Sequence, residues 1–239
     1  MEFSSIEDAT NDGFLNIARQ VNPTPCNEQY FNGRSLAMLF TGASKYKIKF
    51  HHWETNQSVV WNLLKAFTPL ANSQDIANIL NSLSKMRRGL FHVMDKQIQT
   101  ILLDAIDRNI DDNRDPFNSQ EIANTLLALN QMGLKWNTDD LSAELQRKLL
   151  DAIDRNIDNK RDPFNSQAIA NTLFALVEMQ IQIADLFMLQ LTKKLVDQVR
   201  KYLESGEFIS EEKDQVALAL TWLLPVSYTH LTLPTICSV

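Results

Sequence analysis

The feature that most constrains the fold is an internal repeat. Residues 103–129 read LDAIDRNIDDNRDPFNSQEIANTLLAL and residues 150–176 read LDAIDRNIDNKRDPFNSQAIANTLFAL, which are near-copies at an offset of 47. An earlier copy begins at Asn72 and a weaker one at Gly33, and the start of a fifth copy lies at residues 215–220. A period of this length is typical of repeat proteins, in which each copy packs only against its neighbours.

Each copy is expected to form two helices. In the third copy Asn118 is the predicted N-cap, and Glu121 completes a capping box with it. Gly133 supplies the left-handed residue that ends this helix, and the polar residues 137–140 are expected to begin the second helix. A single pair cannot bury its outer apolar face, so pairs must stack. We therefore predict an all-α fold, a right-handed α-solenoid of antiparallel helix pairs with a period of about 47 residues.

The repeats divide the chain into three parts. Residues 1–32 are expected to form an N-terminal cap, and residues 33–224 a domain of four repeats plus the first helix of a fifth. Residues 225–239 resemble the translation of a transposase-type sequencing adapter, the alternative being an apolar tail that matches by chance. The adapter interpretation predicts a truncated gene with natural sequence ending near Leu224, and it removes Cys237 from any argument about chemistry.

Composition excludes several classes of protein. The net charge of −6 and the pI near 5.2 disfavour a general binder of nucleic acid or anionic membranes, although a local basic patch remains compatible with them. Two cysteines, Cys26 and Cys237, form neither a disulfide framework nor a metal-ligand pattern. No apolar run approaches the ~20 residues of a membrane span. We expect a protein in the cytoplasm and no membrane partner.

The phrase FNSQEIANTLLAL at residues 117–129 is similar to a short α-helical repeat of unknown function. That repeat is known mainly from intracellular bacteria, including pathogens that deliver proteins into host cells. More distantly, the phrase resembles the octotricopeptide and FAST-kinase-like repeats of organellar RNA-binding proteins. The likeness covers roughly residues 30–224, is degraded at Met38 and Leu218, and implies architecture without a ligand. It suggests a fragment of an effector-like protein, secreted into a host cell by a route that the sequence does not display.

An asparagine recurs inside the first helix of three repeats, as Asn78, Asn124 and Asn171. A mid-helix asparagine weakens a helix slightly, so its recurrence needs a reason. One interpretation is a ladder of hydrogen bonds between adjacent helices. The other is a row of amides along a groove that grips an extended peptide or nucleotide bases.

Basic residues follow the first helix of repeats one and two. They are Lys45, Lys47, Lys49, His51 and His52 in repeat one, and Lys85, Arg87 and Arg88 in repeat two. The offset of 40 between Lys45 and Lys85 places both groups on one edge of the stack. Because aromatic residues interleave with the first group, this edge suits RNA. The alternative is a solvated loop edge, and repeat three offers only Lys135 there.

Acidic residues alternate from Asp107 to Asp115 in a pattern like a calcium loop, which is repeated from Asp154 to Asp158. The pattern lacks the required glycine and the final glutamate, so charged helix ends paired with Arg108, Arg114, Arg155 and Arg161 are the preferred interpretation. No catalytic motif occurs. We predict a non-enzymatic scaffold that binds a protein or peptide, with RNA binding through the basic edge as the alternative. It would need no cofactor, metal or small-molecule substrate.

Overall fold

The computed structural model describes residues 13, 16, 31–46, 57–111, 115–136, 138–181 and 186–223. Within these residues the regular structure is helical and contains no strand, which confirms the all-α prediction. Most of the expected cap at 1–32 and the whole of 225–239 lie outside the described residues. The α-helices are α2 (Gly33–Lys45), α3 (Gln57–Phe67), α4 (Ser73–Met86), α5 (Lys96–Ile110), α6 (Ser119–Gln131), α7 (Ala143–Ile157), α8 (Ser166–Glu178), α9 (Leu186–Ser205) and α10 (Ser210–Leu223).

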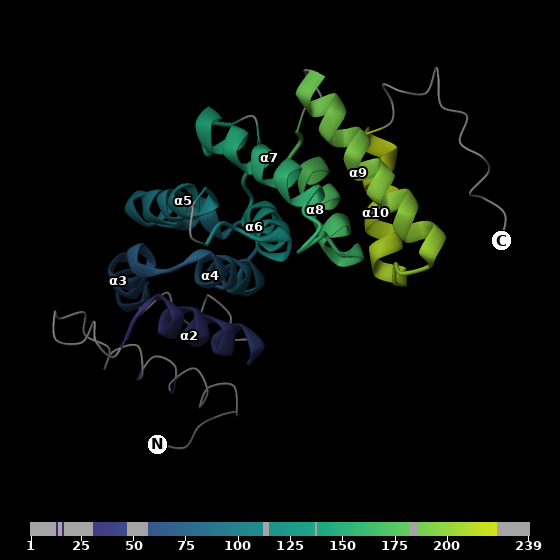
Figure 1. Ribbon diagram of the computed structural model, residues 1–239. Helices are drawn as coiled ribbons and strands as arrows, with labels where there is room; N and C mark the ends of the chain where they lie inside the picture. The colour runs from purple at the N-terminus through teal and green to yellow at the C-terminus, as the bar shows by residue number, and fades with distance from the viewer. Residues whose placement is uncertain are drawn as a thin grey trace.

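The helices form two layers (Figure 1). Helices α2, α4, α6, α8 and α10 lie side by side in chain order, each packed on the next, and we call them the first-helix layer. Helices α3, α5, α7 and α9 form a second row against them, the second-helix layer. Short 3₁₀ turns, Thr68–Leu70 and Leu90–Val93, join the layers at α3–α4 and α4–α5. Successive near-copies of the sequence therefore occupy successive places in both layers.

The first helices begin at equivalent asparagines. The side-chain oxygens of Asn72, Asn118 and Asn165 each accept a hydrogen bond from the backbone N–H three residues later, over 2.9, 2.9 and 2.7 Å. At Asn118 the predicted capping box is confirmed, because the Glu121 carboxylate accepts the Asn118 N–H over 2.9 Å. Each cap satisfies backbone donors that the first helical turn leaves unpaired.

The ends of helices α6 and α7 show one success and one error of prediction. Gly133 has a positive φ of 95°, as expected for the residue that follows helix α6. The second helix, however, begins at Ala143 with Ser142 as its N-cap, and not at residues 137–140. The Thr138 hydroxyl donates to Asp140 over 2.9 Å, which holds this segment in a turn of its own. Polar residues that favour helix caps also favour turns.

A continuous apolar core fills the space between the layers. Phe117 and Phe164, the residue before the N-cap in two repeats, are both 1% exposed. Near the N-terminal end of the described helices, Gly33 lets α2 approach the segment before α4 closely, since a Cβ on Gly33 would lie 2.4 Å from the Ala71 Cα. Burial of this kind is the main stabilising contribution to a stack of helix pairs.

Buried polar side chains close each helix pair. Asn109 and Asn156, 47 residues apart, each donate from Nδ2 to two backbone carbonyls. One carbonyl lies four residues earlier, and the other belongs to the residue before the N-cap of the first helix in the same pair. Asn156, for example, reaches the Phe117 carbonyl over 3.1 Å. In the next pair Tyr202 replaces the asparagine, and its hydroxyl donates to the Phe164 carbonyl. These bonds fix where the end of each second helix meets the start of its first helix.

A serine–aspartate bond connects consecutive repeats. The Ser73 hydroxyl donates to Asp115 over 3.2 Å, and the Ser119 hydroxyl donates to Asp162 over 3.0 Å. Both serines are the first residue of a first helix, and both aspartates precede the proline of the next repeat. The phrase Asp-Pro-Phe-Asn-Ser thus carries a contact to the preceding repeat, a core residue, an N-cap and a contact to the following repeat.

Candidate ligand-binding face

Amide side chains recur at two positions of the first-helix layer. Glutamine is the second residue of helices α4, α6 and α8, and asparagine follows four residues later. Residues four apart lie on the same face of a helix, so each helix presents a glutamine and an asparagine together. We call these six residues the amide face: Gln74, Asn78, Gln120, Asn124, Gln167 and Asn171.

Two members of the amide face take part in a short chain of hydrogen bonds. Asn165 Nδ2 donates to Gln120 Oε1 over 3.3 Å, and Gln120 Nε2 donates to Asn124 Oδ1 over 3.1 Å. An amide group has one acceptor oxygen and a nitrogen with two donors. Because its oxygen is occupied, Asn124 is oriented with its nitrogen free to donate.

The other members keep their hydrogen-bonding capacity. Among the described residues the side chains of Gln74, Asn78, Gln167 and Asn171 have no hydrogen-bond partner within the protein. Asn78 is exposed, whereas Asn171 is only 6% exposed. In the described structure no hydrogen bond joins Asn78, Asn124 and Asn171 to one another. The Asn171 amide atoms are not among the fully buried, unpaired polar atoms of the described residues, so they keep contact with solvent.

A hollow of about 390 Å³ lies at the α2 end of the amide face, between helices α2 and α4. Arg34 and Met38 occupy on α2 the places that glutamine and asparagine take in the later repeats. Both are exposed, Met38 by 68%. The hollow is lined by Arg34, Ala37, Met38, Thr41, Gln74, Asp75 and Asn78. It combines an apolar wall with several hydrogen-bonding groups.

Two carboxyl groups are buried near the starts of these helices. Burial raises the pKa of the Asp75 carboxyl, against the N–H of Asn72 and the charge of Arg34, both of which lower it. Burial likewise raises the pKa of the Glu121 carboxyl, which the Asn118 N–H opposes and the charge of Asp115 reinforces. Both carboxyls lie at the third position of a helix, and that of Glu121 closes the capping box with Asn118.

The basic edge is short. Lys45, Lys85, Arg87 and Arg88 are exposed at the C-terminal ends of helices α2 and α4, whereas Lys47, Lys49 and the histidines at 51 and 52 lie outside the described residues. Helices α6 and α8 end instead at Gln131 and Glu178. Lys135, the one basic residue expected in repeat three, donates to the Glu178 carbonyl over 2.7 Å. Basic charge therefore gathers at only two of the described first helices.

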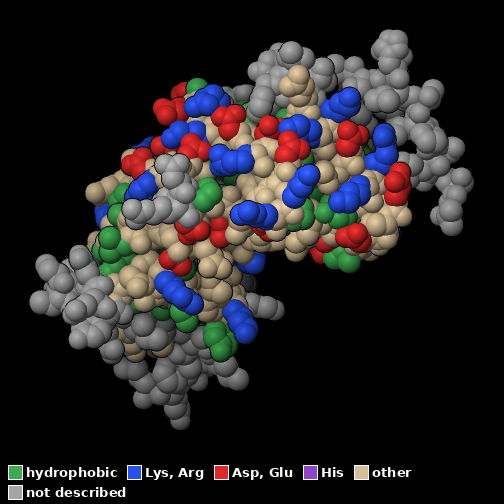
Figure 2. Space-filling view, viewed as in Figure 1, with side chains coloured by type: hydrophobic (Ala, Val, Ile, Leu, Met, Phe, Trp, Pro, Cys, Tyr) green, Lys and Arg blue, Asp and Glu red, His purple; other side chains and the backbone are tan. Residues whose placement is uncertain are grey.

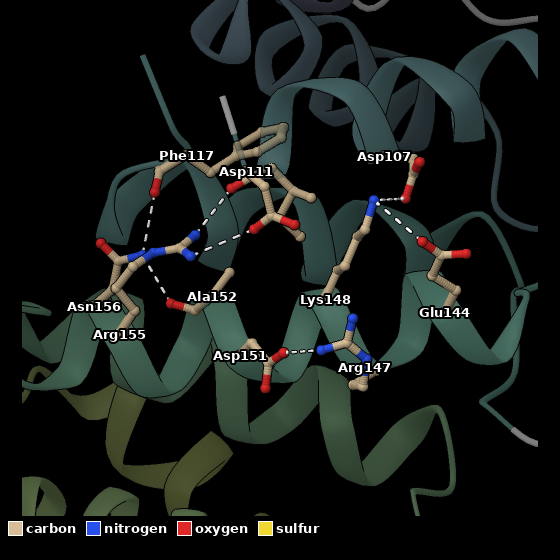
Figure 3. A network of polar contacts seen from close by, with 11 residues as sticks. Asp107, Asp111, Phe117, Glu144, Arg147, Lys148, Asp151, Ala152, Arg155 and Asn156 are labelled. Atoms are coloured by element: carbon tan, nitrogen blue, oxygen red, sulfur yellow. Dashed lines mark hydrogen bonds and ion pairs between the residues drawn. The ribbon is translucent and has the colours of Figure 1, made fainter. Parts of the chain in front are cut away.

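The acidic pattern of the second-helix layer forms ion pairs between repeats (Figure 3). Lys148 on α7 contacts Asp107 on α5 over 2.9 Å, and Lys194 on α9 contacts Asp154 on α7 over 2.7 Å. The bond to Asp107 raises the pKa of the Lys148 ammonium, and those to Asp154 and Asp158 raise the pKa of the Lys194 ammonium. The two pairs are related by the repeat.

Only one of the four arginines expected to pair with this pattern does so in the described structure. Arg155 contacts Asp111 over 3.4 Å and also donates to the Ile110 carbonyl over 2.9 Å (Figure 3). Arg108 donates to the Thr68 carbonyl, the backbone N–H of Arg161 donates to Asn159, and Arg114 lies outside the described residues. The lysines are the main partners. Among the described residues no group of three or more His, Cys, Asp or Glu could hold a metal ion.

Charge on the visible surface follows the second-helix layer. Figure 2 shows Lys and Arg side chains alternating with Asp and Glu over the region that α7 and α9 occupy in Figure 1. The mixture of signs agrees with the ion pairs described above. By contrast, none of the six side chains of the amide face ionises near neutral pH.

Residues 72–80, 98–126 and 132–173 match the model of a family described as "Protein of unknown function (DUF1601)". The match covers less than half of the chain and includes most of helices α5 to α7 and part of α8. No curated protein and no solved structure matches the chain. In the described residues no helix has both the length and the apolar character to cross a membrane.

Sequence reasoning identified the asparagines of the amide face and missed the glutamines. Gln74, Gln120 and Gln167 recur in the phrase Asn-Ser-Gln at the same offsets as the asparagines, so the repeat contains the signal. The structure adds that each glutamine lies one helical turn before its asparagine, on the same face. The roles of Asn109 and Asn156 in closing the helix pairs were also missed.

Proposed function

We propose that the chain is a segment of an α-solenoid that binds a protein or peptide across the amide face and catalyses no reaction. The observation that carries the proposal is the recurrence of uncharged amides at equivalent places on adjacent helices α4, α6 and α8, where four of the six side chains have no partner among the described residues and Asn124 on α6 keeps its nitrogen free. Such groups contribute little to folding, yet a ligand could use each of them. A rigid stack that offers several equivalent contacts loses little entropy on binding.

The packing of the two layers also supports the amide face as the binding surface. Neighbouring first helices contact each other more extensively than neighbouring second helices do. A stack whose members lie closer together in one layer curves towards that layer, so the amide face would line the concave side. Concave surfaces of helical repeats are extended and can contact a ligand over several units at once.

We also propose a cellular location and an origin for the protein. Similarity to repeats of intracellular bacteria supports a fragment of a bacterial, effector-like protein that acts in the cytoplasm or in a host cell. The proposal needs no cofactor, since amide groups act by hydrogen bonding alone.

The test is selection of ligands by the full chain from a display library of random 12-residue peptides. The parent protein should enrich peptides, and Asn78→Arg should abolish the enrichment by filling the amide face with a charged side chain. Asn62→Arg is the matched control, because Asn62 is an exposed asparagine on α3 in the other layer. No enrichment by the parent, or equal loss in both variants, would contradict the proposal.

RNA binding is the second candidate, favoured by the exposed Lys45, Lys85 and Arg88 at adjacent helix ends. Three phosphate contacts should make the logarithm of affinity fall with the logarithm of salt concentration at a slope of about −2. Replacement of all three residues by alanine should flatten that slope. Peptide enrichment should survive the same triple replacement.

A further inference from the structure

We propose that the amide face recognises an uncharged stretch of polypeptide in the polyproline II conformation, and that it holds this stretch through its main chain. The inference rests on the proposed function for the location of the site and adds the conformation and chemistry of the ligand. It is carried by the spacing of the amides, by their free donors and by the absence of charge among them.

Spacing favours polyproline II over the alternatives. Packed helices lie about 8–10 Å apart, so the amide pairs of neighbouring repeats are separated by about that distance. A polyproline II helix repeats every three residues and rises about 9.3 Å in doing so. Every third residue of such a ligand would therefore meet an equivalent glutamine–asparagine pair. In a β-strand successive residues face opposite sides of the chain. Since about three strand residues span one helix spacing, neighbouring repeats would meet opposite sides of such a ligand.

Free donors point to the main chain of the ligand. The side-chain oxygen of Asn124 accepts from Gln120, and its nitrogen has no partner among the described residues. Neither the oxygen nor the nitrogen of the Asn78 amide has a partner there. Asn171 has no hydrogen-bond partner among the described residues and is not one of the fully buried unpaired groups, so its amide is available to a ligand group that reaches it. A polyproline II chain forms no internal hydrogen bonds, and its carbonyls remain available as acceptors.

Charge and shape define the ligand further. Between Gln74 and Asn171 the amide face offers no ionic partner, so a charged side chain there would lose hydration without compensation. At the α2 end, the hollow of about 390 Å³ is lined by the charged Arg34 and Asp75 as well as by Ala37 and Met38, and its apolar wall can contact one apolar side chain. The ligand is thus an uncharged stretch with an apolar anchor residue at one end.

The direct test measures binding of two series of blocked, uncharged 12-residue peptides to the full chain by fluorescence anisotropy. One series is built on Pro-x-x triplets, which favour polyproline II, and the other on Ala, Leu and Gln, which favour helix. The triplet series should bind at least about ten-fold more tightly, since its bound conformation is formed in advance. A 12-residue oligouridylate is the third probe.

Variants locate the contact. Asn78→Ala and Asn124→Ala should each weaken binding of the best triplet peptide about 3- to 10-fold, the loss expected for one hydrogen bond. Asn62→Ala, on α3, should leave binding unchanged. Replacing successive peptide bonds of the ligand by esters weakens one carbonyl acceptor at a time, and the loss should recur at every third position.

The outcomes separate this inference from the proposed function. Enrichment of helical peptides from the random library, with loss in Asn78→Arg, would leave the proposed function intact and overturn the polyproline II ligand. Equal binding of both series, ester effects with a period of two, or no binding of either series would also overturn it. Binding of the oligouridylate that is sensitive to Asn78→Ala, without binding of the triplet series, would assign the face to RNA.

Discussion

The two layers of the stack use their polar side chains differently. In the second-helix layer, lysines and an arginine of one helix contact aspartates of the preceding helix, as in Lys148–Asp107 and Lys194–Asp154. In the first-helix layer, the amides of helices α4, α6 and α8 range from exposed to mostly buried, and four of the six have no partner in the described structure. The second-helix layer thus has polar groups that set the register of the repeats, and the first-helix layer has polar groups that remain available.

The difference between the layers shows how a repeated structural residue can be distinguished from a repeated residue that is available for binding. Asn156 and Asn124 both recur at an interval of about 47 residues, yet Asn156 donates twice to backbone carbonyls and Asn124 keeps its donors free. Recurrence alone does not distinguish the two roles. Partners do.

The largest loss of stability is expected from a substitution in the apolar core between the two layers. Phe117 is 1% exposed, and Phe117→Ala should lower the free energy of unfolding by about 3–5 kcal/mol because it leaves a cavity. Denaturant unfolding followed by circular dichroism measures the loss. Phe117→Leu keeps most of the volume and should lose less. Equal stability of all three proteins would contradict the described core.

Replacing one asparagine in each layer tests the comparison directly. Asn156→Ala should lower the free energy of unfolding by about 1–3 kcal/mol, because the buried Phe117 carbonyl loses its donor. Asn124→Ala should change it by less than about 0.5 kcal/mol in either direction, since the side chain is half-buried and bonds only to a neighbouring glutamine. The same unfolding measurement serves both. A larger loss for Asn124→Ala would reverse our assignment of the layers.

The ion pairs of the second-helix layer should have a smaller effect. Lys194 lies 2.7 Å from Asp154 and 2.6 Å from Asp158, but its side chain is 36% exposed, so solvent screens the attraction. Lys194→Met should cost about 0.2–1 kcal/mol, less at high salt. A double-mutant cycle with Asp154→Asn isolates the pair. A coupling energy of zero at low salt would mean that these contacts do not set the register.

The smallest expected effect has the opposite sign and depends on pH. Because burial raises the pKa of Glu121 above its ordinary 4.5, the ionised carboxylate weakens the fold at neutral pH. Glu121→Gln keeps an acceptor for the Asn118 N–H and should raise stability by a few tenths of a kcal/mol at pH 7.

The sign of the pH dependence follows from linkage. A raised pKa means that the folded state binds the proton more tightly, so the contribution of Glu121 is fully present below 4.5 and is lost as pH rises through the folded pKa. The advantage of Glu121→Gln should therefore shrink as the pH is lowered towards 4.5. Thermal unfolding at a series of pH values measures it. An advantage that grows in acid would mean that the carboxylate stabilises the fold.

The helical class and the N-cap at Asn118 could be predicted because they depend on residues close in sequence. Asn118 and Glu121 act within one helical turn, and a period of 47 residues is visible directly. The start of α7 was misplaced because residues 138–140 can cap either a helix or a turn, and only the tertiary structure decides.

Partners across repeats could not be predicted in the same way. The arginines beside the acidic pattern were the obvious partners, yet Lys148 and Lys194 reach it from the next helix. Which of several nearby cations pairs with a carboxylate depends on how the helices are placed against one another. Half of the candidate site followed from sequence through Asn78, Asn124 and Asn171, and the glutamine beside each asparagine required the helix face to be known.

The contact between Ser73 and Asp115 has a consequence for how such a gene can change length. Each contact of this kind reaches only the next repeat, and residues 104–150 form one 47-residue unit whose excision joins Leu103 to Asp151 without altering the local sequence. Asp162 would then stand opposite Ser73, and Asn156 would face the Ala71 carbonyl in place of Asn109. Recombination between near-identical copies can therefore add or remove whole repeats while every junction stays intact.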